Sequence, residues 1–125
     1  MPFLFLREQE VLDLHYQLIE EFGGLHGLRD EGALESALTA AENLEYYKNA
    51  DLATCAAAYA YHLSQAHAFV DGNKRVAAAA SETFIELNGS HLTSTNEQIV
   101  TLLLDIAGGK LSRDDVVRCF QRWTS

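Results

Sequence analysis

The sequence predicts an all-α fold, a compact bundle of about six helices joined by short loops, and three observations support this prediction. Apolar side chains recur at three- and four-residue steps along most of the chain, which is the period of one helix face. A single proline among 125 residues permits long, uninterrupted helices. Glycine pairs and capping residues, such as Gly23-Gly24, Asp30 and Gly108-Gly109, stand where helices should begin or end.

The length and composition of the chain favour a single domain, residues 1–125, because 48% hydrophobic residues are enough for one packed core at this length. The net charge of −9 disfavours direct binding to nucleic acid, which is itself densely negative. No membrane association is expected, since no segment has the length and apolar composition of a membrane span. Cys55 and Cys119 have no metal-ligand spacing, and two reduced thiols agree with an expected cytoplasmic location.

The expected elements follow in chain order. Residues 1–6 indicate a strand or an extended arm. Helices are expected over residues 8–22, 30–41, 51–66, 73–87, 95–106 and 112–123. The alanine-rich range 51–66 has almost no surface charge, so we expect it to be buried on most sides and central in the bundle. Residues 42–50 lose the helical period, and we expect a loop or short hairpin there, with Tyr46 and Tyr47 in it.

The connection between the two most buried helices, residues 67–75, is unusually rich in functional side chains. Gly72 allows a tight turn and the close approach of a ligand. The helix that begins near Asn73 should present unpaired amides and the positive end of its dipole. Lys74 and Arg75 add two positive charges to that helix start, where the dipole alone disfavours a cation by about 0.3–1 kcal/mol. An anion such as a phosphate chain would complete this site.

His67 and Asp71 are the candidate catalytic residues of the connection. A histidine titrates near neutral pH, so His67 is suited to act as a general base. Asp71 offers the oxygen ligand that Mg²⁺ prefers beside phosphate groups. Phe69, between them, is an apolar side chain suited to anchor the loop to the core. The pattern predicts attack by a hydroxyl on a phosphorus of ATP or another nucleoside triphosphate.

Each residue also has an ordinary structural interpretation. His67 could end one helix, Asp71 could cap the next, and Lys74 and Arg75 could be solvated charges, although their joint occurrence favours a site. Two other function classes compete with a transferase. One is a binding module with an inactive site. The other is a metal hydrolase that uses His62, His67 and Asp71, and it is weaker because a five-residue step turns His62 by about 140° around a helix.

The residues from His67 to Arg75, His-Ala-Phe-Val-Asp-Gly-Asn-Lys-Arg, resemble the signature of the death-on-curing (Doc) toxins, a branch of the Fic (filamentation-induced-by-cAMP) superfamily. Further similarity at residues 23–37, 84–89 and 107–112 extends the resemblance over most of the chain. The resemblance implies a Fic/Doc-type bundle of about six helices. It also implies that residues 42–50 correspond to the flap of the family, where Tyr46 and Tyr47 would help to dock a target segment.

The resemblance also implies roles for the residues of the loop. His67 would be the base that activates a target hydroxyl, and Asp71 would be the acid next to the magnesium ion. Gly72 would belong to the nucleotide-binding turn. Asn73, Lys74 and Arg75 would bind phosphate.

Two departures from the Fic pattern favour one branch of the superfamily. Lys74 stands where AMP-transferring Fic enzymes usually have a glycine, and Ala78 where they usually have a second arginine. In the Doc branch these two differences accompany binding of the nucleotide in an inverted orientation and transfer of its terminal phosphate. The resemblance therefore implies a toxin-like protein kinase that acts on a translation elongation factor, with AMP transfer as the alternative.

The resemblance also bears on regulation. Many Fic proteins carry an inhibitory motif, a Ser or Thr four residues before a Glu-Gly or Glu-Asn pair. Here Glu31-Gly32 and Glu42-Asn43 are preceded at that distance by Gly27 and Leu38, so the motif does not occur. The resemblance then implies inhibition in trans, by an antitoxin whose tail folds into a groove of this domain.

Overall fold

The computed structural model describes residues 3–125 and confirms the all-α prediction. In this range the helices are α1 (Glu8–Phe22), α2 (Glu31–Lys48), α3 (Leu52–Ala66), α4 (Asn73–Leu87), α5 (Asn96–Ala107) and α6 (Arg113–Trp123). Two isolated antiparallel bridges, Leu28 with Phe69 and Leu92 with Thr124, are the β structure found among these residues. None of the described helices is long and apolar enough to cross a bilayer.

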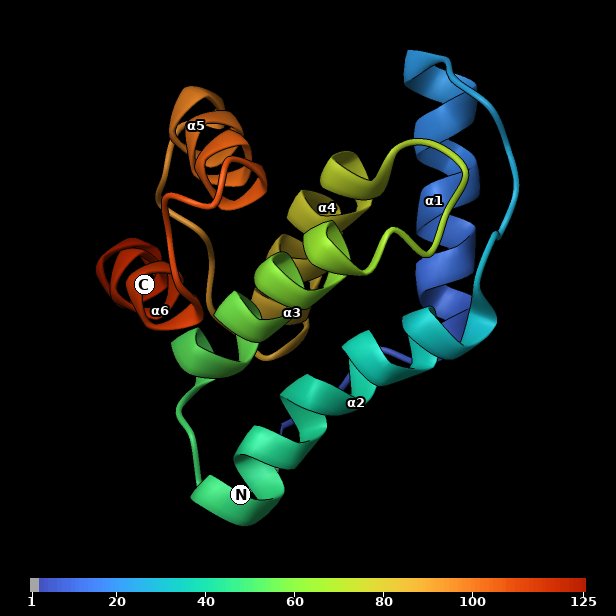
Figure 1. The fold of residues 1–125 in the computed structure, drawn as a ribbon. Helices are drawn as coiled ribbons and strands as arrows, with labels where there is room; N and C mark the ends of the chain where they lie inside the picture. The colour runs from blue at the N-terminus through green and yellow to red at the C-terminus, as the bar shows by residue number, and fades with distance from the viewer. Residues whose placement is uncertain (1–2) are drawn as a thin grey trace.

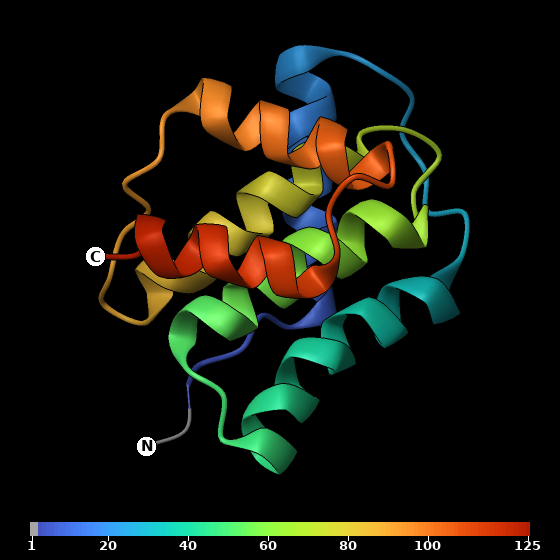
Figure 2. The same ribbon diagram turned by 60° about the vertical axis from the view of Figure 1, so that its left-hand side comes forward.

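The helices α3 and α4 form the centre of the bundle (Figure 1), and α3 packs against α2, α4, α5 and α6. α1 and α2 cover one side of this pair, and α5 and α6 cover the other, as the turned view in Figure 2 also shows. The composition of α3 explains its position, because Ala56, Ala57, Ala58 and Ala60 are at most 1% exposed. Side chains this small let several neighbouring helices approach one helix closely.

Most of the predicted helix starts are confirmed by their capping side chains. Asp30 and Asp51 each accept a hydrogen bond from the backbone amide three residues ahead, at the starts of α2 and α3. Thr95 and Ser112 open α5 and α6 with capping boxes. These side chains bind amides that a helix start leaves without an intrahelical partner. α4 differs, because it follows Gly72, which has no side chain that could cap it.

The predicted loop or hairpin over residues 42–50 is wrong, because α2 continues unbroken to Lys48. This stretch contains no glycine or proline that would end a helix. The helical period fades because the end of α2 extends past the core, where Tyr46 and Tyr47 are 79% and 72% exposed. Asn49 then ends the helix in the left-handed conformation, with φ of 51°. The described chain therefore has no hairpin flap at this position.

The N-terminal residues 3–6 form an extended arm rather than a strand. The N–H of Leu6, which is buried, donates to the hydroxyl of Tyr59 on α3 at 3.0 Å. The side-chain amide of Asn88, just after α4, bonds to the backbone of the arm through both its oxygen and its nitrogen. These bonds fix the arm across the central pair. Residues 1–2, which the same expectation included, lie outside the described residues.

Candidate active site

The loop of residues 67–72 joins α3 to α4 and lies against α1. His67 ends α3 in the left-handed conformation, with φ of 50°, which histidine adopts more readily than most residues. Its carbonyl accepts a hydrogen bond of 2.8 Å from the guanidinium of Arg29. At Gly72, a Cβ would come within 3.1 Å of the Cδ1 of Ile19 on α1. Glycine at this position therefore lets the loop lie directly on α1.

The glycine-rich segment of residues 23–30 runs beside this loop and is hydrogen-bonded to it. The carbonyl of Ala68 accepts the N–H of Arg29 at 2.7 Å, and the N–H of Val70 donates to the carbonyl of Gly27 at 3.0 Å. Two connections that are far apart in the sequence thus pair as short extended pieces. Each connection restrains the other.

Asn73 and Phe69 brace the loop from within. The side-chain oxygen of Asn73 accepts the N–H of Phe69 at 3.1 Å, and its nitrogen donates to the Phe69 carbonyl at 3.0 Å. Phe69 is 2% exposed, and its ring stacks on the ring of His15 with centroids 3.8 Å apart. Since the Asn73 side chain is engaged in the loop, the backbone N–H of Asn73 is the group that it offers to a ligand.

His15 on α1 is a buried site residue that the sequence analysis missed. It is 4% exposed, and its Nε2 lies 2.7 Å from the carbonyl oxygen of Asp71. Because a carbonyl oxygen only accepts hydrogen bonds, Nε2 carries the hydrogen and donates it. Val11, His15 and Ile19 follow one another at four-residue steps on the buried stripe of α1. A histidine on such a stripe needs a polar partner, and that pattern was the signal available in the sequence.

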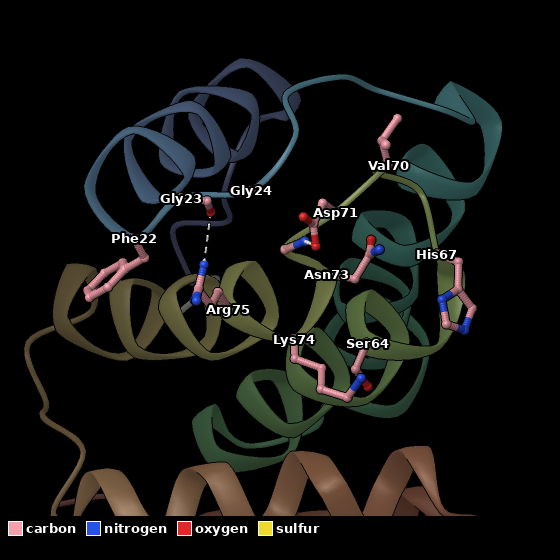
Figure 3. Close-up of a pocket in the computed structure, with 11 residues that line it drawn as sticks. Phe22, Gly23, Gly24, Ser64, His67, Val70, Asp71, Asn73, Lys74 and Arg75 are labelled. Atoms are coloured by element: carbon pink, nitrogen blue, oxygen red, sulfur yellow. Dashed lines mark hydrogen bonds between the residues drawn. The ribbon is translucent and has the colours of Figure 1, made fainter.

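A cavity of about 440 Å³ opens between this loop, the start of α4 and the end of α1 (Figure 3). We call it the catalytic-loop pocket. It is lined by Phe22, Gly23, Gly24, Ser64, His67, Val70, Asp71, Gly72, Asn73, Lys74 and Arg75. The structure thus brings the sequence-based candidates His67, Asp71 and the residues 72–75 to one pocket.

Tyr46 and Tyr47 do not belong to this pocket. α2 begins beside the catalytic loop, where the N–H of Asp30 donates to the carbonyl of Ala68 at 3.0 Å. Tyr46 lies sixteen residues after Asp30, which is roughly 24 Å along a helix axis. The helix that carries these tyrosines leads away from the catalytic-loop pocket, so they do not lie beside it. Their expected role in docking a target segment stays a prediction.

The start of α4 presents free backbone amides to the pocket. The first hydrogen bond of this helix runs from the N–H of Val76 to the carbonyl of Gly72 at 3.0 Å. The three N–H groups of residues 73–75 precede that bond, and α4 has no side-chain cap to bind them. Amides of this kind at the positive end of a helix dipole are a binding site for an anion such as phosphate.

Lys74 and Arg75 add positive charge to the same helix start, but they are held differently. Arg75 donates to the carbonyl of Gly23 at 3.2 Å, and its guanidinium carbon lies 5.2 Å from the centroid of the Phe22 ring. Lys74 is exposed and makes no ion pair within residues 3–125. Arg75 is thus oriented before any ligand binds, while the Lys74 ammonium is available for an anion.

The Asp71 carboxylate is oriented by two backbone amides. It accepts the N–H of Leu25 at 3.2 Å and the N–H of Gly72 at 2.9 Å. These bonds, with a smaller contribution from the positive charge of Arg75, hold the pKa of Asp71 below its ordinary value. The carboxylate is therefore ionised near neutral pH and keeps lone pairs for another ligand. One carboxylate beside a phosphate site fits the way in which Mg²⁺ binds nucleotides.

His62 lies outside the catalytic-loop pocket. Its Nε2 accepts a hydrogen bond of 3.3 Å from Arg113 at the start of α6, and burial, together with this guanidinium, lowers its pKa. Among the described residues, no group of potential metal ligands combines His62 with His67 and Asp71. The structure therefore gives no support to a metal hydrolase built on these three residues.

Comparison with known proteins places the chain in context. A family model described as "Fic/DOC family" matches residues 5–85. The chain is 29% identical over 115 residues to "Protein kinase doc" of Escherichia phage P1, covering 91% of this chain and 90% of that protein. It is 41% identical over 75 residues to "Toxin Doc" of Mycolicibacterium smegmatis, covering 58% of each chain.

Proposed function

The chain belongs to the Fic/DOC family, and we propose that it is a toxin-like protein kinase that transfers the terminal phosphate of a nucleoside triphosphate to a hydroxyl of a target protein. One observation carries this proposal: an imidazole, a carboxylate, an uncapped helix start and two cations line a single pocket. The names of the relatives support it further, since one is called a protein kinase and the other a toxin.

The proposed reaction assigns a step to each of these groups. The ring of His67 makes no hydrogen bond to another described residue in the structure, so it is free to take the proton of a target hydroxyl. The hydroxyl oxygen then attacks the terminal phosphorus, the bond to the bridging oxygen breaks, and a nucleoside diphosphate leaves with the electron pair. The amides at the start of α4 and the Lys74 ammonium would stabilise the charge on the phosphoryl oxygens.

ATP, or another nucleoside triphosphate, is the proposed phosphate donor, with Mg²⁺. Asp71 would hold the metal through its ionised carboxylate, together with oxygens of the nucleotide. A metal bound there would offset part of the phosphate charge.

Transfer of phosphate rather than AMP is favoured by the distribution of cations. Lys74 and Arg75 both lie in the first turn of α4, and the next turn offers Ala78, which carries no charge. AMP transfer would place the innermost phosphate at His67 and leave two outer phosphates to be bound further along. Both cations of this pocket instead come from the first turn of α4, beside its free amides, and a phosphate bound at that helix start suits the terminal phosphate.

The proposed partners follow from the same family. We infer that the target is a translation elongation factor, as the resemblance to the Doc branch implies. We infer also that an antitoxin, supplied in trans, inhibits the protein, since relatives of this kind are named as toxins. Both partners imply action in the cytoplasm.

The decisive experiment supplies a cell extract with Mg²⁺ and with ATP labelled either at its terminal or at its innermost phosphorus. The proposal expects transfer of the terminal label to a protein band. His67→Ala should reduce the transfer by about 10²–10⁴-fold, because it removes the general base. His91→Ala is the matched control, since His91 is an exposed histidine outside the pocket.

The other outcomes of this experiment are equally informative. Transfer of the innermost label would mean AMP transfer and would overturn the kinase assignment. No label on any protein, together with normal growth of cells that express the chain without an antitoxin, would indicate an inactive binding module. Equal labelling by wild type and His67→Ala would remove His67 from the reaction.

A further inference from the structure

A second cavity lies at the opposite end of α2 from the catalytic-loop pocket, between the N-terminal arm and the last turns of α2. Figure 1 shows this end of α2 far from the loop that joins α3 to α4. The cavity has a volume of about 420 Å³ and is lined chiefly by Phe3, Phe5, Glu42, Glu45, Tyr46 and Tyr47. We call it the aromatic–acidic pocket.

The pocket has one fixed aromatic wall and one exposed aromatic wall. Phe5 stacks on Phe84 of the core with centroids 5.4 Å apart, and Phe3 meets Phe5 edge to face at 6.4 Å. Tyr46 and Tyr47 form the other wall, in edge-to-face contact at 4.8 Å. Both tyrosines are mostly exposed, and exposed tyrosines beside a cavity are typical of surfaces that bind a partner.

The charge of the pocket is negative. Glu42 and Glu45 are about one turn apart on α2, and neither forms an ion pair within residues 3–125. No lysine or arginine of the described chain lines the cavity. An anion would be repelled here. An uncharged apolar group would remove water from the two carboxylates and give them no partner, which is unfavourable.

We propose that the aromatic–acidic pocket docks an arginine or lysine side chain from a basic segment of a partner protein. A cation that lies over an aromatic ring and next to a carboxylate interacts favourably with both the aromatic and the acidic side chains of the pocket. Arginine fits better than lysine, because its planar guanidinium stacks on a ring while it bonds to a carboxylate. The chain's net charge of −9 attracts a basic segment over a longer range.

Docking at this pocket is independent of the proposed transferase activity. The pocket shares no lining residue with the catalytic-loop pocket. The two tyrosines lie roughly 24 Å along α2 from the catalytic loop, because a helix rises about 1.5 Å per residue. A segment bound here leaves the catalytic-loop pocket open. Binding can therefore be measured without nucleotide, and a failure of the transferase proposal would leave this result intact.

The test uses a fluorescein-labelled peptide with two arginines in a glycine–serine background, and the same peptide with citrulline, which has the shape of arginine without its charge. Fluorescence anisotropy should show binding of the arginine peptide to the full chain and much weaker binding of the citrulline peptide. The double variant Tyr46→Leu/Tyr47→Leu should weaken binding by about 2- to 30-fold, the range expected for a cation–aromatic contact. Glu42→Gln/Glu45→Gln should weaken it to a similar degree.

The controls make one substitution of each kind elsewhere on the surface. Tyr16→Leu replaces an exposed tyrosine of α1, and Glu97→Gln neutralises an exposed carboxylate of α5. Both should bind the arginine peptide like wild type. The proposal is overturned if the citrulline peptide binds as tightly as the arginine peptide, if neither peptide binds, or if both double variants bind like wild type.

Discussion

At the scale of single residues, the shape of the catalytic loop depends on contacts that come from outside it. His15 donates to the carbonyl of Asp71 and stacks on Phe69, so one ring of α1 touches the loop at two points. The rings of His15 and Phe69 are buried, and the hydrogen bond to Asp71 is partly buried, so its loss would be compensated only in part by water. We therefore regard His15 as a positioning residue for the carboxylate of Asp71.

His15→Ala should lower both stability and activity. It removes a buried ring and leaves the Asp71 carbonyl without its donor, which together should cost about 2–4 kcal/mol of unfolding free energy. Urea unfolding measures that loss, and transfer of the terminal label of ATP measures activity. His15→Gln retains an N–H donor and should recover part of the activity, whereas His91→Ala should change neither quantity. Full activity in His15→Ala would show that the contact does not position Asp71.

Much of the candidate site could be predicted from sequence, because its groups are contiguous. The loop of residues 67–75 carries its own turn, helix start, cations and candidate base, and all of these line one pocket in the structure. His15 and Gly24 were not predicted as part of the site. Their contacts with the catalytic loop depend on which surface of α1 and its C-terminal end faces that loop. Packing between segments about fifty residues apart in the sequence determines this orientation.

At the scale of elements, two glycines at the end of α1 offer a matched comparison. Gly23 and Gly24 both have positive φ, 88° and 114°, so any other residue is strained at either position. A Cβ at Gly24 would lie 2.7 Å from the Oδ2 of Asp71, whereas a Cβ at Gly23 would meet nothing within 4 Å. A Cβ at Gly24 would also lie 3.2 Å from the Cδ1 of Ile19, so the two positions share the positive φ and differ in the contacts with Asp71 and Ile19.

Gly24→Ala should therefore reduce activity far more than Gly23→Ala, because it forces the Asp71 carboxylate out of place. We expect both variants to lose a similar amount of stability, about 1–3 kcal/mol, since the strain is common to both. Thermal unfolding and the labelling assay together separate these effects. If the two variants lost activity equally, strain in the segment, rather than the position of Asp71, would be responsible.

Helices were predicted well where they bury one face and poorly where they leave the core. The expected starts of α2, α3, α5 and α6 differ from the observed ones by one residue, and a capping side chain stands at each of them. The last two turns of α2 were mistaken for a loop, because two adjacent exposed tyrosines interrupt the apolar pattern. The local signal for a helix was the absence of glycine and proline from this stretch, and it was outweighed by the missing apolar period. The N-terminal arm, which lines a cavity together with this helix end, lies far away in the sequence.

The contact between α3 and α6 gives a prediction for pH dependence. Burial and the charge of Arg113 lower the pKa of His62 below its ordinary value. When the pH falls through about 6.5, the unfolded chain binds a proton at this histidine before the folded chain does, so stability decreases. His62→Gln keeps an acceptor for Arg113 and should remove this part of the loss. Unfolding free energies between about pH 7.5 and 5.5 test this, with the exposed His91→Gln as control. An unchanged slope in His62→Gln would contradict the assignment.

At the scale of the whole molecule, the structure is organised around one central helix of small residues. One contiguous core includes buried side chains from all the described helices, and α3 is the helix shared by most of the packing contacts. A domain of this size with a single core should unfold in one cooperative step. The catalytic loop should unfold in the same step, because it connects α3 directly to α4.

Ala57→Leu tests this organisation. Ala57 is fully buried on α3, and added methylenes at that position have no space, so the variant should lose about 1–3 kcal/mol of unfolding free energy. Because the core is shared, the midpoint should shift equally when followed by far-UV circular dichroism and by the fluorescence of Trp123, the single tryptophan, which lies on α6. Ala107→Leu makes the same change at an exposed position at the end of α5 and should stay within about 0.5 kcal/mol of wild type. If the two probes gave different midpoints, α6 would unfold separately and the helices would not share one core.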